Sequence, residues 1–199
     1  MYLQFEDVSK IFKNYIARTN IVALDKISFK VNSGEIALIT GKNGSGKSTL
    51  LRLASRMLKP SSGKVFFNES IKKNIRYCPD DPDIYGQVIL KDYFQLIRKL
   101  SSQKDLKIEN WIRDFELTDW IEEPIKNLSR GTKYKVALIT TLYDNPKLVL
   151  LDEPFSTLDE PSRIILSQKM IEFQEKGTSF MISDLKSLKG TKTTQIIAL

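Results

Sequence analysis

Histidine is absent from this sequence of 199 residues, and cysteine occurs once, at Cys78. A disulfide needs two cysteines and zinc sites are typically built from several Cys and His ligands, so an internal disulfide and a zinc-type cluster are excluded. We interpret Cys78 as a small packing residue. Apolar runs stay far below the about 20 residues of a transmembrane helix. Because Glu6 and Asp7 stand near a start that has no apolar stretch, we expect no signal peptide and a cytosolic chain.

Glycine is also scarce, at nine residues, yet three of them fall within residues 41–49, GKNGSGKST. This segment satisfies the phosphate-loop pattern G-x-x-x-x-G-K-[ST]. It lies between a buried-strand pattern at 36–39 and helical apolar spacing at 50–58. Glycines let successive N–H groups converge on phosphate oxygens at a helix N-terminus. A chance glycine-rich turn is the alternative. We predict a nucleoside-triphosphate site with the binding residues Gly41, Asn43, Gly44, Ser45, Gly46, Lys47, Ser48 and Thr49.

Two carboxylates follow a second apolar run, LVLLDEP at 148–154. The run predicts a buried strand that Pro154 ends. Beside a phosphate loop, Asp152 is expected to hold Mg²⁺ through water, with the Ser48 hydroxyl as a further oxygen ligand. Glu153 is expected to polarise the attacking water, and Lys47 to reach the β and γ phosphates.

Two further segments carry a resemblance. LSRGT at 128–132 precedes a helical pattern at 133–143, and STLD at 156–159 follows the carboxylates. With the phosphate loop, these motifs resemble the ATP-binding-cassette (ABC) ATPase family, whose signature is LSGGQ and whose D-loop follows the second carboxylate. The resemblance implies an α/β P-loop NTPase fold with a RecA-like mixed-sheet core, an N-terminal antiparallel β part and a small helical subdomain. Residues 1–199 then form one cassette, with 1–87 and 146–199 as the nucleotide-binding core and 88–145 as the helical subdomain.

The resemblance also implies a partner cassette. In this family two cassettes pair head to tail, alike or unlike, and the signature of one closes over the ATP of the other. Ser129 would then contact the partner's γ-phosphate through its hydroxyl, and Gly131 through its N–H. Arg130 and Thr132 depart from the family's Gly and Gln, and we interpret Arg130 as a solvated surface side chain. Ser129 is equally expected to cap the helix that follows it.

The missing histidine is the sharpest departure from the family. The strand pattern at 178–183 should present the family's switch histidine, and Asp184 stands in its place. In the alternative alignment the histidine is deleted and Asp184 matches the Asp that often follows it, which leads to the same expectation. An ionised carboxylate cannot donate a hydrogen bond to a γ-phosphate and repels it, so we expect slow hydrolysis. Asp80 replaces the family's Gln in YCPDDP at 77–82; it can still offer an oxygen to Mg²⁺ but not an amide donor to water.

Aromatic residues have two competing interpretations. The family stacks adenine on an aromatic residue near the end of the first strand, predicted here over 2–12, which makes Phe12 the candidate and Tyr15 the second; core packing is the alternative for both. Residues 88–100 and 106–121 read as helical, and we interpret Trp111 and Phe115 as core residues. The resemblance implies a groove that receives a helix of a membrane subunit, with the candidate groove residues Tyr77, Ile84 and Tyr85.

Charge is uneven along the chain, whose formal net charge is +7. Residues 42–76 hold nine Lys or Arg and one acid, which suits a nucleotide site near an anionic membrane surface. A nucleic-acid or ribosome-acting ATPase is the alternative, but acidic residues 105–123 disfavour contact with a phosphate backbone, so no nucleic acid is expected. We therefore predict the ATP-binding subunit of a membrane transporter, peripheral on the inner face of the membrane. The sequence ends with the strand-like segment 194–199 and shows no C-terminal regulatory extension of the kind that some importer cassettes carry, which favours export.

Overall fold

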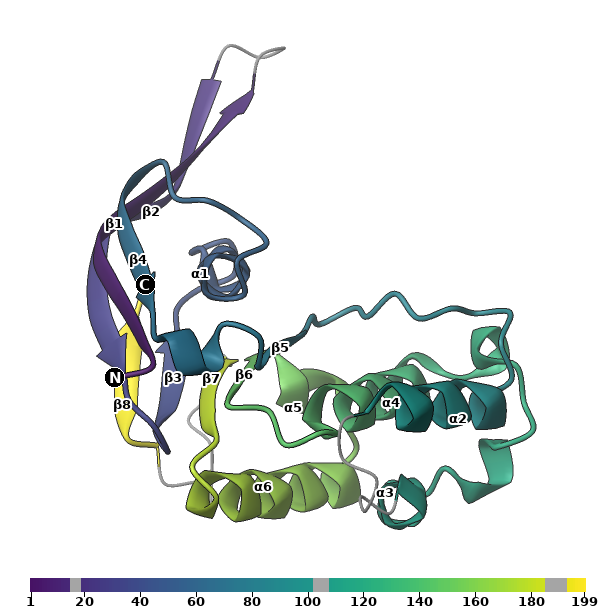
Figure 1. The fold of residues 1–199 in the computed structure, drawn as a ribbon. Coiled ribbons are helices and arrows are strands. Elements are labelled where there is room, and N and C mark those ends of the chain that lie inside the picture. Colours follow the sequence, from purple (N-terminus) through teal and green to yellow (C-terminus); the bar gives the residue numbers. More distant parts are fainter. Residues whose placement is uncertain (15–18, 102–107, 185–192) are drawn as a thin grey trace.

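The computed structural model describes residues 1–14, 19–101, 108–184 and 193–199 (Figure 1). In these ranges the strands form two sheets. The first is antiparallel, in the order β2-β1-β4. Its strands are β1 (Leu3–Asn14), β2 (Thr19–Val31) and β4 (Ser62–Phe67). The far ends of β1 and β2 project beyond the rest of the molecule as a two-stranded arm (Figure 1).

The second sheet is parallel throughout, in the order β5-β6-β7-β3-β8. Its three central strands are fully or almost fully buried, which explains their continuous apolar sequences. The predicted strands at 36–39, 148–152 and 178–183 are confirmed, and sequence reasoning missed β5. The strands are β3 (Ile36–Thr40), β5 (Ile75–Cys78), β6 (Leu148–Asp152), β7 (Ser179–Ser183) and β8 (Gln195–Ala198). The predicted α/β fold with an antiparallel N-terminal part is therefore confirmed.

Helix α1 (Lys47–Ala54) follows β3 directly and is shorter than predicted. We expected helical structure to Leu58, but the helix ends at Ala54. Arg56 adopts a left-handed backbone with φ 67°, a conformation that ends helices, and the Leu58 N–H bonds back to the Arg52 carbonyl at 3.1 Å. The last turn of the apolar pattern therefore packs as a loop.

The described part of residues 88–145 is helical, with no strand of either sheet. Its helices are α2 (Leu90–Leu100), α3 (Ile108–Asp114), η2 (Thr118–Trp120), η3 (Ile125–Asn127) and α4 (Arg130–Leu142). The segment 106–121, expected to be helical, forms α3 and η2 in its described part. Leu106 lies outside the described residues, and α3 stops because Glu116 turns left-handed at φ 55°. Trp111 and Phe115 are buried, as predicted, with ring centroids 6.3 Å apart.

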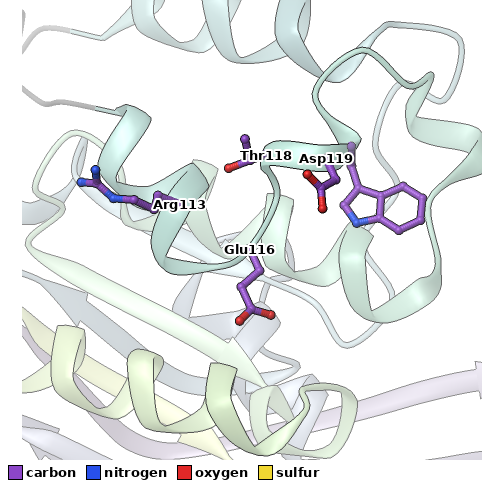
Figure 2. Close-up of a pocket in the computed structure, with 5 residues that line it drawn as sticks. Arg113, Glu116, Thr118 and Asp119 are labelled. Atoms are coloured by element: carbon purple, nitrogen blue, oxygen red, sulfur yellow. The ribbon is translucent and has the colours of Figure 1, made fainter.

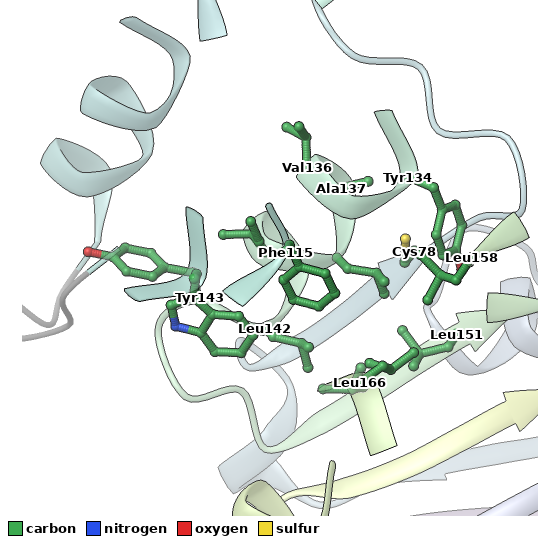
Figure 3. Close-up of a cluster of buried hydrophobic side chains, with 14 of the residues drawn as sticks. Cys78, Phe115, Tyr134, Val136, Ala137, Leu142, Tyr143, Leu151, Leu158 and Leu166 are labelled. Carbon is green, nitrogen blue, oxygen red and sulfur yellow. The ribbon is translucent and has the colours of Figure 1, made fainter. Parts of the chain in front are cut away.

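Two hydrophobic clusters lie on opposite sides of the parallel sheet. One joins the sheet to the helical part and to α6 (Glu160–Glu175), and Figure 3 shows Phe115, Tyr134 and Leu166 within it. The other joins the sheet to α1 and the antiparallel sheet. Cys78 lies in the first cluster, and burial raises its pKa to about 12, which agrees with a packing role. Of the helices in the described ranges, none is both long and apolar enough to pass through a bilayer.

Candidate functional site

The phosphate-loop segment connects β3 to the first turn of α1. Among the described residues, no side chain caps this end of α1; Gly46, the residue before it, has a left-handed φ of 105°. A Cβ at Gly46 would lie 2.2 Å from the carbonyl oxygen of Ala23, so only glycine fits here. A Cβ at Gly44 would meet no atom within 4 Å, which leaves open space above the loop. The loop therefore presents uncapped helix N–H groups toward that space, an arrangement that suits phosphate.

Lys47 lies beneath this loop with only 5% of its surface exposed. Its Nζ donates hydrogen bonds to the carbonyl oxygens of Gly41 at 3.1 Å and Lys42 at 3.3 Å. The same ammonium lies 3.6 Å from Glu153 Oε1. The buried Ser45 hydroxyl has no hydrogen-bond partner in the described structure. A buried cation and an unpartnered hydroxyl in a glycine loop fit a bound phosphate chain.

Asp152, the last residue of β6, is 1% exposed, and both of its carboxylate oxygens accept hydroxyl hydrogen bonds. Ser183 Oγ donates to Oδ1 at 2.5 Å, and Tyr77 Oη donates to Oδ2 at 3.1 Å. Burial and the neighbouring Asp152 raise the pKa of Tyr77, so its hydroxyl stays protonated as a donor. Tyr134 Oη donates to the backbone carbonyl of Asp152 at 3.3 Å.

Glu153 follows at once in a left-handed conformation, with φ 48° and ψ 46°. Its N–H is shared between the Ser183 carbonyl oxygen and the Ser183 hydroxyl, each at 3.0 Å. About 30% of its side chain is exposed. Left-handed backbone costs about 1–3 kcal/mol outside glycine and is concentrated at functional sites. The bend turns the Glu153 carboxylate toward Lys47 and solvent, whereas that of Asp152 stays buried.

Strand order brings these groups to one edge of the sheet. The carboxyl ends of β3, β7 and β6 are neighbours, and ligands of open α/β sheets bind at such an edge. The loop follows β3, Asp184 follows β7, and the two carboxylates end β6. The Asp184 N–H bonds to the Ile39 carbonyl at 3.2 Å, which fixes this residue beside the phosphate-loop strand. Asp80 follows β5, next along the same edge, and is half-buried.

The chemistry of the donors fits Mg²⁺. Ser48 lies in the first turn of α1, and Asp152 ends β6. Oxygen ligands from one hydroxyl and one or two carboxylates, completed by water and phosphate, are what Mg²⁺ uses at nucleotide sites. Among the described residues no group of three or more acidic or cysteine side chains could hold a metal ion by itself. A metal held jointly by protein, water and nucleotide needs no such group.

The signature segment begins α4. Ser129 caps the helix, because its Oγ accepts the Thr132 N–H at 3.1 Å, so the capping interpretation is confirmed. Arg130 is exposed, as expected of a solvated side chain. Ser129 is exposed too, and the Cβ position of Gly131 faces the Thr157 carbonyl at 3.4 Å. The signature thus packs on the D-loop of its own chain and leaves its serine on the surface.

The structure supports some of the predicted roles of the adenine and groove candidates and contradicts others. Phe12 is 38% exposed on the β1–β2 arm, where Lys10 Nζ lies 5.2 Å from its ring centroid, so the core-packing alternative is wrong and adenine stacking stays a prediction. Tyr15 lies outside the described residues. Tyr77 belongs to the Asp152 site, which corrects its assignment to the groove. Ile84 lines a polar depression of 310 Å³ with Asp83 and Lys126, whereas Tyr85 is exposed and is not among the lining residues.

A second depression, of 450 Å³, lies in the helical part (Figure 2). Its lining residues are Arg113, Glu116, Thr118, Asp119 and Trp120. Its residue Arg113 belongs to α3, and Figure 1 shows α3 and α1 at opposite ends of the molecule. The depression is open and mixed in charge, and it contains neither the loop nor the carboxylates that could act on a phosphate.

Comparisons with known proteins agree with this geometry. A sequence profile described as ABC transporter matches residues 24–156. An ABC transporter ATP-binding protein of Methanocaldococcus jannaschii is 32% identical over 164 residues, covering 80% of this chain and 61% of that protein. The zinc import ATP-binding protein ZnuC of Rickettsia conorii is 32% identical over 187 residues, covering 91% of this chain and 75% of that protein.

Solved structures share the fold. An ABC transporter ATP-binding protein from Pyrococcus furiosus aligns with a TM-score of 0.79 at 24% identity, covering 99% of this chain and 98% of that chain. The chain spans less than two thirds of the archaeal sequence relative, at 61% of its length.

Proposed function

Because the chain belongs to the ABC transporter family as an ATP-binding protein, we propose that it binds and hydrolyses MgATP to drive a membrane transporter. The observation that carries this proposal is the meeting of a buried lysine under a glycine loop with two carboxylates at one edge of the sheet. We assign residues 1–87 and 146–199 to the nucleotide-binding core and 88–145 to the helical subdomain.

Each side chain has a distinct part in the reaction. Lys47 neutralises the β and γ phosphates. The binding set is Gly41 and the residues from Asn43 to Thr49, with Phe12 stacked on the adenine. Ser48 and Asp152 hold Mg²⁺, with Asp80 as a further oxygen ligand; the ion screens the phosphate charge. Glu153 accepts a hydrogen bond from the attacking water. The bond from water oxygen to the γ-phosphorus forms as the bond to the ADP oxygen breaks.

We infer that hydrolysis is slow in the isolated chain. The backbone of Asp184 is fixed beside β3 by its N–H bond to Ile39, and this residue is a carboxylate where the family has a histidine. A carboxylate there repels the γ-phosphate. The proposed active dimer is head to tail, with the exposed Ser129 and the half-buried Gly131 of each cassette closing over the nucleotide of the other. Pairing with an unlike cassette is compatible with the same geometry.

The proposal also includes a partner in the membrane, an integral membrane subunit that is a separate chain. The depression next to Ile84, between the Asp80 loop and the helical part, is the proposed binding site for a helix of that membrane chain. The cytoplasmic face of the membrane is the proposed location. Export stays a prediction, since the Rickettsia relative named for zinc import covers 91% of the chain. A nucleic-acid-acting ATPase is the alternative class, and salt-dependent retention on DNA or RNA would favour it.

The experiment measures MgATP binding, turnover and dimerisation of the pure chain and of Glu153→Gln. The matched control is Glu175→Gln, at the exposed C-terminal end of α6. We expect wild type and control to bind MgATP and turn over well below the enzyme median of about 10 per second. Glu153→Gln should bind equally well, abolish the residual turnover and raise the dimer fraction with MgATP. Wild type that binds no MgATP would overturn the proposal.

A further inference from the structure

Two hydroxyl groups hold the Asp152 carboxylate from neighbouring strands, and neither has been given a role at the nucleotide site so far. We propose that Ser183 and Tyr77 are positioning residues that orient Asp152 for Mg²⁺, with Ser183 also fixing the peptide that carries Glu153. This inference rests on the proposed MgATP site. It concerns residues that would touch neither the nucleotide nor the metal and would act through Asp152 and Glu153.

The Ser183 hydroxyl makes two hydrogen bonds, one as donor and one as acceptor. It donates its proton to Asp152 Oδ1 at 2.5 Å and accepts the Glu153 N–H at 3.0 Å. A hydroxyl has one donor and two acceptor positions, so both contacts are made at once. Ser183 is itself 0% exposed on the central strand β7, where packing fixes its rotamer. One hydroxyl thus sets the direction of the metal carboxylate and anchors the left-handed turn before the water-polarising one.

The Tyr77 hydroxyl binds the second oxygen of the Asp152 carboxylate. It donates to Asp152 Oδ2 at 3.1 Å from β5, the strand that pairs with β6. Each carboxylate oxygen therefore has one hydroxyl donor, and each keeps lone pairs for water of a metal shell. A carboxylate held at both oxygens cannot rotate about its terminal bond toward the Lys47 ammonium. Partners of this kind commonly change metal affinity by about 10–100-fold when removed.

Tyr77 and Ser183, the two residues that hold the Asp152 carboxylate, lie next to segments discussed above. The tyrosine lies on the strand that runs into the Asp80 loop, and Ser183 directly precedes Asp184. A shift of either strand end moves a hydrogen bond on the metal carboxylate. The two donors therefore tie the metal site to two of the segments in which this chain departs from the family pattern, those of Asp80 and Asp184.

The test measures the Mg²⁺ concentration that half-saturates binding of a fluorescent ATP analogue, alongside nucleotide affinity in EDTA and the thermal midpoint. The variants are Ser183→Ala, Ser183→Thr and Tyr77→Phe. Two matched controls remove similar hydroxyls elsewhere. Ser179→Ala acts at the other end of β7, where Oγ donates to the Asn32 carbonyl at 2.7 Å; Tyr93→Phe acts in α2, where the hydroxyl accepts from Thr140.

We expect Ser183→Ala to raise the Mg²⁺ requirement about tenfold or more, and Tyr77→Phe to raise it less, with nucleotide affinity in EDTA unchanged. Ser183→Thr, which keeps the hydroxyl, should restore the wild-type requirement, and both controls should leave it unaltered. If Ser183→Ala does not fold, Tyr77→Phe decides. An unchanged Mg²⁺ requirement in folded Ser183→Ala or Tyr77→Phe overturns the inference alone, whereas wild type without Mg²⁺-dependent binding overturns the proposed function with it.

Discussion

Replacing Lys135 by methionine removes one half of an ion pair that braces the D-loop. Lys135 lies in α4, and its Nζ contacts Asp159 Oδ2 at 2.9 Å. The lysine side chain is 11% exposed, whereas that of Asp159 is 53% exposed. Asp159 also caps α6, because its Oδ1 accepts the Ser162 N–H at 3.0 Å. The two partners are therefore unequal: one charge is nearly buried, and the other is at the surface and has a second role.

That inequality sets the expected magnitudes. Methionine fills the volume of Lys135 and leaves only a solvated carboxylate, so we expect Lys135→Met to cost about 1 kcal/mol or less at pH 7. Asp159→Asn keeps the cap but leaves the buried ammonium without an anion. Breaking a fully buried pair costs about 3–5 kcal/mol, and the exposure of Asp159 reduces our expectation to about 2 kcal/mol. Asp159→Ala should lower the free energy of unfolding by about 1 kcal/mol more than Asp159→Asn, because alanine also removes the cap of α6.

At acid pH, the difference in free energy of unfolding between wild type and Lys135→Met should become smaller. The hydrogen bond from Lys135, aided by Ser162, lowers the pKa of Asp159 to about 2. A carboxyl with a lowered pKa in the folded state adds stability above its ordinary pKa of about 4, and this stability is lost as pH falls toward 2. Urea unfolding followed by tryptophan fluorescence at pH 7, 4 and 3 measures the gap. A gap that stays constant or widens with acid, or Lys135→Met costing more than Asp159→Asn, would refute the reasoning.

Three shorter predictions concern packing. Gly46→Ala should abolish nucleotide binding, measured by titration, because its Cβ would lie 2.2 Å from a backbone carbonyl oxygen. Phe115→Ala should lower the free energy of unfolding by about 3–5 kcal/mol in urea melts, since Phe115 is 0% exposed. The Cys78 thiol, with its pKa raised to about 12, should react with thiol reagents at pH 8 only at the rate of unfolding; rapid labelling of the folded chain would contradict its burial.

Local patterns predicted the elements whose chemistry is contiguous in sequence. The glycine loop, the apolar run before Asp152 and the strands at 36–39 and 178–183 are each complete within ten residues or fewer, so periodicity and spacing suffice. β5 was missed because its sequence, IRYC, carries an arginine and lies at the edge of the parallel sheet. The early end of α1 was missed because left-handed Arg56 stands where glycine or asparagine would have signalled the turn.

The contacts of Asp152 depended on strand order. Tyr77 and Ser183 are far apart in the chain, and both reach Asp152 only because β5 and β7 flank β6. Sequence reasoning assigned Tyr77 to a groove, since a local pattern contains no information on which strands are neighbours. Polar residues at the carboxyl ends of two apolar strands, Asp152 and Ser183, were the available signal. Their pairing required the three-dimensional order.

The place of β7 between β6 and β3 also bears on how the chain is made. β3 and β6 leave the ribosome first, and neither pairs with the other; both pair with β7, which is synthesised after them. Until then, two apolar strands are present with unpaired edges, which are the segments most prone to aggregate in a nascent chain. The sheet therefore closes in a late, non-local step, and cleavage or arrested synthesis within α6 would leave the phosphate loop and the carboxylates of Asp152 and Glu153 on strands that no backbone hydrogen bonds of the sheet connect.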